Sequence, residues 1–298
     1  MSRPGPVSVW LSACRPKTLP AAAVPVLVGS AEAWRLGGFD PLPAAICLGF
    51  ALLMQIGVNF ANDAWDHEKG ADMAERTGPR RAVASGWVSG RTMKRAAFGV
   101  LALGFCLGLT LTAWGGPWLI AVGIASVLGA LAYTAGPFPL AYRGWGDVFV
   151  ILFFGLIAVG FTTYVQTGDF AGSAWLLGLA IGLLANNILV VNNLRDIESD
   201  ARVGKRTLAV RLGRTGSLLQ YQLSVTIACL VPVALYLQTG AWPVVLAAFV
   251  YPFGRYQGLA LARARTPDAY SRMLARTSLL LVMFGLLASA GLVLSRPA

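Results

Sequence analysis

The chain has 298 residues, of which 56% are hydrophobic and only 12% are charged, and its mean hydropathy is +0.65. A soluble domain carries about 25% charged residues, so this composition excludes an ordinary soluble protein and favours a chain that crosses a membrane several times. The formal net charge of +11 would suit a nucleic-acid-binding protein, but the placement of the basic residues, described below, argues against that class.

Apolar stretches run from one end of the chain to the other, and a membrane-spanning helix needs about 20 mostly apolar residues. Nine stretches qualify, at residues 18–36, 42–61, 94–114, 117–135, 146–166, 173–193, 219–238, 242–261 and 274–294. We therefore predict an all-α polytopic membrane protein with a single domain over residues 1–298. About nine transmembrane helices are expected to form one bundle around a central cavity that opens to the cytoplasmic side.

The basic residues predict the orientation of this bundle. Nine crossings place the two termini on opposite sides, and 22 of the 24 Lys and Arg residues then lie on the side of the N-terminus. Because cytoplasmic loops are enriched in Lys and Arg, the N-terminus is predicted to be cytoplasmic. We expect a multi-pass protein of the bacterial cytoplasmic (inner) membrane, with the lipid bilayer as its surroundings and no nucleic-acid partner.

Eight of the 13 acidic residues fall in two clusters, five between positions 63 and 75 and three between 196 and 200. Each cluster follows an even-numbered predicted span and is preceded by asparagines at membrane depth, where polar side chains are costly and usually functional. The first reads Asn59-Phe-Ala-Asn62-Asp63-Ala-Trp-Asp66 and continues to Asp72, and the second reads Asn192-Asn193-Leu-Arg-Asp196-Ile-Glu-Ser-Asp200. Spacings of three and four predict that the polar side chains of each cluster share one helix face.

The two clusters also match each other, because Asn62-Asp63-x-x-Asp66 superposes on Asn192-Asn193-x-x-Asp196. They lie 130 residues and four predicted spans apart. This match predicts a duplicated four-helix unit, over residues 15–140 and 145–265, with a ninth helix added.

The clusters point to a metal and a phosphate. Several carboxylates at one helix end repel one another unless a cation lies among them, and Mg²⁺ takes one or two carboxylates together with water and substrate phosphates. Basic residues suited to phosphate oxygens follow each cluster, namely Arg76, Arg80 and Arg81 after the first and Arg202, Lys205, Arg206 and Arg211 after the second. A structural explanation competes, since charged loops are common beside membrane helices.

These motifs resemble the intramembrane aromatic prenyltransferases of the UbiA superfamily, over nearly the whole chain. Further stretches are most similar to the branch that prenylates 1,4-dihydroxy-2-naphthoate in menaquinone biosynthesis. They are Arg15-Pro-Lys-Thr-Leu-Pro, Asn-Asp-Ala-Trp-Asp-His-Glu-Lys-Gly-Ala-Asp at 62–72, Tyr133-Thr-Ala-Gly-Pro-Phe-Pro-Leu-Ala-Tyr142 and Gly204-Lys-Arg-Thr-Leu-Ala-Val-Arg-Leu-Gly213.

The resemblance implies a reaction. Mg²⁺ held by Asp63, Asp66, Asp72, Asp196 and Asp200 would bind a polyprenyl diphosphate, and the allylic C–O bond would ionise. The ring of the aromatic acceptor would attack the cation and lose CO₂, giving a demethylmenaquinone. Besides the aspartates, Lys205 is expected to be catalytic. Substrate binding is expected at Asn59, Asn62, Arg76, Asn192, Asn193 and Arg206.

Four further residues have two interpretations each. Arg15 and Lys17 are expected to bind the carboxylate of the acceptor, or else to act only as cytoplasmic anchors. Tyr133 and Tyr142 are expected to contact the acceptor or the cation, or else to be interfacial aromatic residues.

Two alternative functions stay open. A related enzyme would use another acceptor, such as 4-hydroxybenzoate, homogentisate, haem or a chlorophyllide. A cation-coupled transporter would carry acidic residues at mid-membrane, often in broken helices, whereas these carboxylates lie at span ends on one side.

Overall fold

The structure is a computed structural model that describes residues 4–70 and 81–295, and this part of the chain is all-helical. Short 3₁₀ helices lie at residues 16–18, 140–143 and 242–250, and a π-helical turn at 152–157 joins α7 to α8. The α-helices are α1 (Pro6–Ala13), α2 (Pro20–Arg35), α3 (Pro41–Glu68), α4 (Gly90–Leu109), α5 (Thr112–Gly115), α6 (Leu119–Ala132), α7 (Gly146–Ile151), α8 (Ala158–Thr167), α9 (Gly172–Arg195), α10 (Ile197–Arg202), α11 (Leu208–Thr239), α12 (Tyr251–Arg263) and α13 (Pro267–Leu294).

Seven helical stretches of the described residues are long and apolar enough to cross a membrane. They include α3, α9, α11 and α13, together with the stretches Gly90–Gly115, Gly146–Thr167 and Trp242–Arg263. The remaining two predicted spans correspond to α2 and α6, which are shorter helices of 16 and 14 residues. The predicted all-helical class is therefore confirmed, whereas the count of nine crossings stays a prediction.

Several helix starts follow from capping chemistry. The Asp40 side chain accepts a hydrogen bond from the backbone N–H of Leu42 at the start of α3, and Ser89 caps α4 in the same way. Thr207 and Thr266 cap α11 and α13. Because the first N–H groups of a helix have no partner within it, such side chains stabilise these starts.

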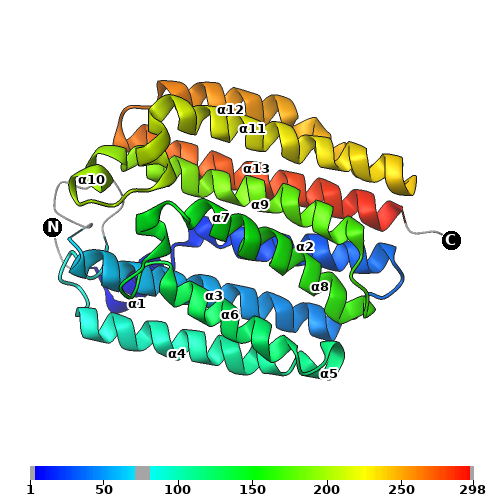
Figure 1. Ribbon diagram of the computed structural model, residues 1–298, viewed down its shortest axis with the longest axis horizontal. Helices are drawn as coiled ribbons and strands as arrows, with labels where there is room; N and C mark the ends of the chain where they lie inside the picture. Colours follow the sequence, from blue (N-terminus) through cyan, green and yellow to red (C-terminus); the bar gives the residue numbers. More distant parts are fainter. Residues whose placement is uncertain (1–3, 71–80, 296–298) are drawn as a thin grey trace.

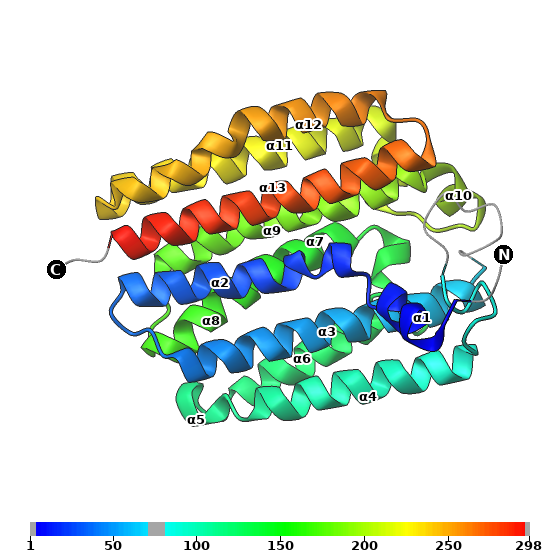
Figure 2. The same ribbon diagram turned by 180° about the vertical axis from the view of Figure 1, so that it is seen from behind.

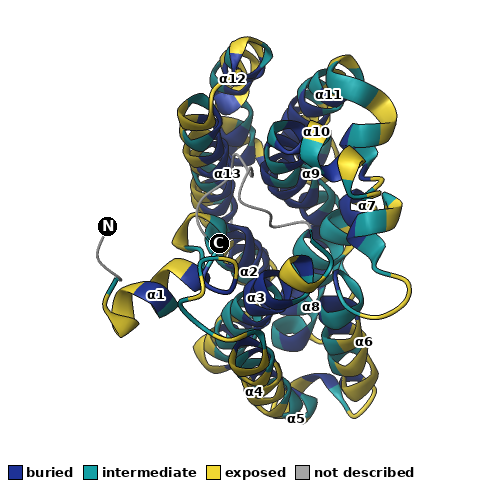
Figure 3. Cartoon of the chain, turned by 90° about the vertical axis from the view of Figure 1, so that its left-hand side faces the viewer, coloured by how far each residue is buried: buried dark blue, intermediate teal, exposed yellow. Residues whose placement is uncertain are grey.

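The helices lie side by side in one elongated bundle (Figure 1), and the view from behind shows the same arrangement (Figure 2). Helices α1 and α10 lie at one end of the bundle, and α13 finishes at the other end, near the C-terminus. Seen from the first end (Figure 3), α1 projects sideways from the bundle. This end carries the C-terminal ends of α3 and α9, and therefore both polar motifs.

Helix α9 is the most buried of the seven candidate spans. It packs against the π-helical turn through three glycines. A Cβ atom added to Gly155 would lie 2.4 Å from the carbonyl oxygen of Gly178 and 2.5 Å from the Cα of Gly182. Small residues allow such backbone contact between membrane helices, where the hydrophobic effect does not pull them together.

Candidate active site

A cavity of about 310 Å³ lies at the end of the bundle that carries the two motifs. Its walls come from the C-terminal ends of α3 and α9, from the start of α7 and from the segments around residues 12–18, 81–82 and 205–208. Ten of the site residues predicted from the sequence line it, namely Arg15, Lys17, Asn62, Asp63, Asp66, Tyr133, Asn192, Asn193, Asp196 and Lys205. The two motifs, far apart in the sequence, therefore face one space.

In the first motif, Asp63 holds the loop that follows α3. Its Oδ2 accepts a hydrogen bond of 3.1 Å from the backbone N–H of Ala82, and its Oδ1 accepts one of 3.2 Å from that of Val83. The carboxylate is 2% exposed, so both hydrogen bonds are shielded from water. Arg81 is thereby held next to the motif, where its guanidinium donates to the carbonyl oxygen of Asn62 at 2.9 Å.

Asp66 connects the first motif, through Tyr142, to the basic segment that follows the second motif. The Tyr142 hydroxyl donates to Asp66 Oδ1 at 2.9 Å, and Arg81 Nη2 lies 3.2 Å from Asp66 Oδ2. Two ammonium groups lie over the Tyr142 ring as cation–π contacts, with Lys69 Nζ 4.9 Å and Lys205 Nζ 5.2 Å from the ring centroid. Burial lowers the pKa of Lys69, while Asp66 opposes that shift.

The second motif is not one continuous helix. Helix α9 ends at Arg195, and Asp196 has non-helical backbone angles (φ −97°, ψ 9°) before α10 begins. The prediction that Asn193, Asp196 and Asp200 share one face of a helix is therefore wrong at Asp196. The Arg195 guanidinium binds both oxygens of Asp196 at 2.7 Å, a bidentate pair across adjacent residues.

Asp200 is the residue of this motif best suited to a cation. Its Oδ1 lies 3.4 Å from Lys205 Nζ, and among the described residues its buried Oδ2 has no hydrogen-bond partner. Burial raises the pKa of Asp200 to about 6; the charge of Lys205 opposes this shift, and repulsion by Asp196 and Asp66 adds to it. A divalent cation at this position would relieve both the repulsion and the missing partner.

A complete metal site is not preformed. In residues 4–70 and 81–295, no three His, Cys, Asp or Glu side chains gather closely enough to hold a metal ion. Mg²⁺ commonly uses one or two carboxylates and takes its other ligands from water and substrate phosphates. One or two of Asp66, Asp196 and Asp200, whose charges repel one another, could supply such carboxylates to an ion whose coordination the substrate completes.

The backbone at Arg15 is strained. Arg15 is the only non-glycine residue with positive φ among those described (φ 51°), a conformation that persists where the surroundings enforce it, often at functional sites. Asn59 supplies part of the constraint, because its amide donates to the carbonyl oxygen of Cys14 at 2.9 Å and to Thr18 Oγ1 at 3.2 Å. Asn59 therefore positions the segment that carries Arg15 and Lys17.

Four of the predicted site residues that the structure describes lie outside this cavity. Asn59, Tyr142, Asp200 and Arg206 do not line the cavity. Asn59, Tyr142 and Asp200 support residues that do line it, as described above, and Arg206 is exposed. Asp72 and Arg76 lie outside the described residues.

The structure also adds residues that the sequence did not single out for the site. Thr134, Asp147 and Arg195 line the cavity, as does Arg81, which the sequence analysis had named only as a basic residue suited to phosphate. Thr134 donates from its hydroxyl to Asn62 Oδ1 at 3.0 Å. Asp147 had a visible signal, since it is one of only 13 acidic residues and begins a predicted span.

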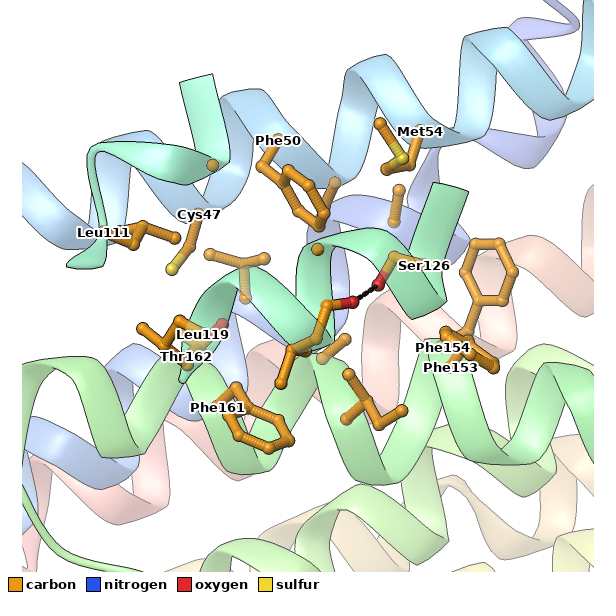
Figure 4. Close-up of a pocket in the computed structure, with 18 of the residues that line it drawn as sticks. Cys47, Phe50, Met54, Leu111, Leu119, Ser126, Phe153, Phe154, Phe161 and Thr162 are labelled. Atoms are coloured by element: carbon orange, nitrogen blue, oxygen red, sulfur yellow. Dashed lines mark hydrogen bonds between the residues drawn. The ribbon is translucent and has the colours of Figure 1, made fainter. Parts of the chain in front are cut away.

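A second cavity, of about 130 Å³, is apolar (Figure 4). It lies among α2, α3, α4, α6 and the Gly146–Thr167 stretch, and its walls include Phe50, Met54, Phe153 and Phe161. Ser126 is one of its few polar lining residues, and its hydroxyl is occupied by a hydrogen bond of 2.8 Å to the carbonyl oxygen of Val122. This space suits a hydrocarbon group.

The fold and the two cavities define a multi-pass helical membrane protein with a charged cavity at one end of its bundle and an apolar cavity inside. The model of the UbiA prenyltransferase family matches residues 22–293. The chain belongs to the UbiA prenyltransferase family, which confirms the resemblance seen in its motifs.

Several relatives of this chain share one name. The 1,4-dihydroxy-2-naphthoate octaprenyltransferases of Escherichia coli and Haemophilus influenzae are 38% and 34% identical to it, covering 96% and 97% of this chain and 96% of each relative. The protein of the same name from Mycobacterium tuberculosis is 42% identical over 79% of this chain and 80% of its own length.

Solved structures share the fold. A UbiA homologue from Archaeoglobus fulgidus, bound to DMAPP and Mg²⁺, gives a TM-score of 0.61 at 14% identity and covers 94% of this chain and 99% of its own. Digeranylgeranylglyceryl phosphate synthase gives a TM-score of 0.60 at 18% identity, covering 96% of this chain and 98% of its own.

Proposed function

We propose that this protein transfers a polyprenyl group from polyprenyl diphosphate to 1,4-dihydroxy-2-naphthoate, with loss of CO₂ and diphosphate, to give the quinol form of a demethylmenaquinone. The observation that carries this proposal is the 38% identity to the E. coli octaprenyltransferase across 96% of both chains. The charged cavity and the apolar cavity support it, because a polyprenyl diphosphate has an anionic head and a hydrocarbon tail.

The charged cavity suits the diphosphate only together with cations. Its lining carries five basic side chains (Arg15, Lys17, Arg81, Arg195 and Lys205) and four acidic ones (Asp63, Asp66, Asp147 and Asp196). This near balance of charge does not by itself neutralise a diphosphate. Mg²⁺, held by Asp66, Asp196 and Asp200, would supply the charge that stabilises the leaving group.

The side chains of the protein have separate tasks in this proposal. Arg81 and Lys205 bind the phosphate oxygens. Asn62, Asn192 and Asn193 bind phosphate or metal-bound water without adding charge. The two amide hydrogen bonds to Asp63 favour a positioning role for this residue over the direct metal coordination predicted from the sequence. Asp72 stays a proposed ligand and Arg76 a proposed phosphate contact.

The bilayer placement belongs to the same proposal. We place nine crossings, including α2 and α6, in the bacterial inner membrane, with the N-terminus and the charged cavity on the cytoplasmic side. The distribution of Lys and Arg supports this orientation. We also propose that residues 15–140 and 145–265 are related four-helix repeats, because their motifs match.

An acceptor assay tests the proposed function. Purified protein is incubated with Mg²⁺, a polyprenyl diphosphate and either 1,4-dihydroxy-2-naphthoate or 4-hydroxybenzoate. We expect a prenylated naphthoquinone product and no product from the benzoate. Absence of the first product would overturn the proposal, and product from the benzoate alone would support the related enzyme with another acceptor.

Arg15→Glu tests whether Arg15 binds the carboxylate of the acceptor. Since a charge-assisted hydrogen bond would become a repulsion, the KM for the naphthoate should rise about tenfold or more, with the KM for the donor unchanged. Arg263→Glu is the matched control, because Arg263 is exposed at the end of α12 and does not line the cavity. Steady-state kinetics of both variants checks this expectation. Equal kinetics for both variants would leave Arg15 as a cytoplasmic anchor.

A further inference from the structure

A carboxylate from α7 faces the charged cavity, apart from both aspartate motifs. Asp147 lies in the first turn of α7, is 4% exposed and lines the cavity. Burial of an acidic side chain is costly unless hydrogen bonds compensate for it. Asp147 therefore needs an explanation beyond the diphosphate site.

The hydrogen bonds of Asp147 are unevenly divided between its two oxygens. Asn186 of α9 donates to Oδ1 at 3.1 Å, and Gln220 of α11 donates to Oδ1 at 2.7 Å. Both of these side-chain donors use Oδ1 and neither uses Oδ2, and the backbone N–H of Asp147 itself also stabilises the carboxylate. Because the side chain lines the cavity, Oδ2 is the oxygen available to a ligand.

The surroundings of Asp147 suit an aromatic acceptor better than a phosphate. A negative carboxylate repels phosphate oxygens and needs a hydrogen-bond donor. The hydroxyl of Tyr133 lies within electrostatic reach of Asp147 and of Arg15. A Cβ atom added to Gly146, next to Asp147, would lie 3.1 Å from that hydroxyl. An aromatic side chain, a cation and a hydrogen-bond acceptor thus line one part of the cavity.

We propose that Asp147 Oδ2 accepts a hydrogen bond from a ring hydroxyl of the aromatic acceptor. This inference rests on the proposed function. In 1,4-dihydroxy-2-naphthoate the C1 hydroxyl lies beside the carboxylate and can bond to it internally. The C4 hydroxyl is the free donor, and it binds Asp147 while the carboxylate binds Arg15.

This arrangement makes Asp147 a residue that determines acceptor specificity. A site built around a hydrogen bond to a substrate hydroxyl rejects an analogue that lacks the hydroxyl, because a buried polar group is then left unpaired. The bond also draws the hydroxyl proton toward Asp147 and so leaves more electron density in the ring that attacks the allylic carbon.

Asp147→Asn is a sharp test because Asn186 and Gln220 both donate to Oδ1. The carboxamide oxygen of the variant will take these two bonds, which turns its amino group toward the cavity. The ring hydroxyl then loses its bond to a carboxylate and can only accept one from a neutral amide. We expect the KM for the naphthoate to rise about tenfold to a hundredfold, with the KM for the donor unchanged. Asp268→Asn is the matched control, since it makes the same change at an exposed residue that does not line the cavity.

A substrate analogue supplies a readout that a purely structural role would not change. 1-Hydroxy-2-naphthoate lacks the C4 hydroxyl and is tested as a competitive inhibitor. Wild-type protein should bind it about tenfold or more weakly than the dihydroxy compound, and Asp147→Asn should bind the two alike.

Equal binding of both compounds by the wild-type protein would overturn the inference, whatever the stability of the variant. If Asp147→Asn still bound the dihydroxy compound more tightly than the analogue, by the same factor as the wild type, the inference would be overturned as well. A wild-type protein that does not prenylate the naphthoate at all would instead overturn the proposed function.

Discussion

Replacing Asp200 with asparagine is expected to lower prenyl transfer at least about a hundredfold, because the variant loses a carboxylate that would hold Mg²⁺ against the leaving diphosphate. The substitution should not lower the stability of the fold. Asp200 is buried, its Oδ2 has no partner among the described residues, and Asp66 and Asp196 repel it. The metal-free variant is therefore expected to be as stable as the wild type, or more stable.

The pKa of Asp200 predicts how the stability difference between the variant and the wild type changes with pH. Burial raises the pKa of Asp200 to about 6 from its ordinary value of 3.8, so the folded protein binds this proton more tightly than the unfolded chain. The ionised group thus destabilises the fold above pH 6, and this penalty is lost as the pH falls through 6 towards 3.8. The stability advantage of Asp200→Asn should be largest above pH 6 and disappear near pH 4.

Thermal unfolding in EDTA at pH 5 and pH 7.5, together with turnover in Mg²⁺, measures both effects. Asp268→Asn serves as the control, since Asp268 is an exposed aspartate. A variant that keeps a near-normal rate would show that Asp200 holds no metal. A variant that unfolds at a lower temperature at pH 7.5 would show that its bond to Lys205 outweighs the repulsion.

Asp63→Ala is expected to have the opposite combination of effects, with both activity and stability lost. The substitution leaves the backbone N–H groups of Ala82 and Val83 without acceptors in a buried place, at a cost of about 1–3 kcal/mol for each. We expect the free energy of unfolding to fall by about 2–4 kcal/mol. Turnover should fall with it, because Arg81 would no longer be held beside Asp66.

Asp63→Asn is the companion variant, because its carboxamide oxygen can still accept one of the two hydrogen bonds. Its stability should lie between that of the wild type and that of Asp63→Ala, as measured by thermal unfolding. If Asp63→Ala were inactive yet as stable as the wild type, the direct metal coordination predicted from the sequence would be the better explanation.

Features that depend on nearby residues could be predicted from the sequence, whereas features that depend on contacts between distant residues could not. Hydropathy and helical spacing placed the helical stretches and the first motif correctly, because these depend on neighbours within a few residues. The two amide hydrogen bonds of Asp63 could not be predicted, because their donors lie 19 and 20 residues away in a loop that carries no periodic signal. The break at Asp196 was missed because spacing alone continues a helix through it.

Asp147 is a second residue whose contacts could not be predicted from the sequence. Its charge within an apolar stretch was visible, but its partners Asn186 and Gln220 come from α9 and α11. Only the packing of three helices brings them together. A helix boundary was also missed: α11 extends from Leu208 across a non-helical backbone at Gly213, whereas the predicted span begins at residue 219.

The size of the apolar cavity has a consequence for the products. A volume of about 130 Å³ is close to the engineered cavity of about 150 Å³ that accepts one benzene molecule. In this form it would accommodate roughly one five-carbon isoprene unit, and under the proposed function the rest of a long tail would extend beyond it. Such a protein would not select its donor by chain length. Donors of four and eight isoprene units should therefore be used at similar rates in a competition assay. The length of the quinone side chain would then be decided by whichever synthase makes the donor.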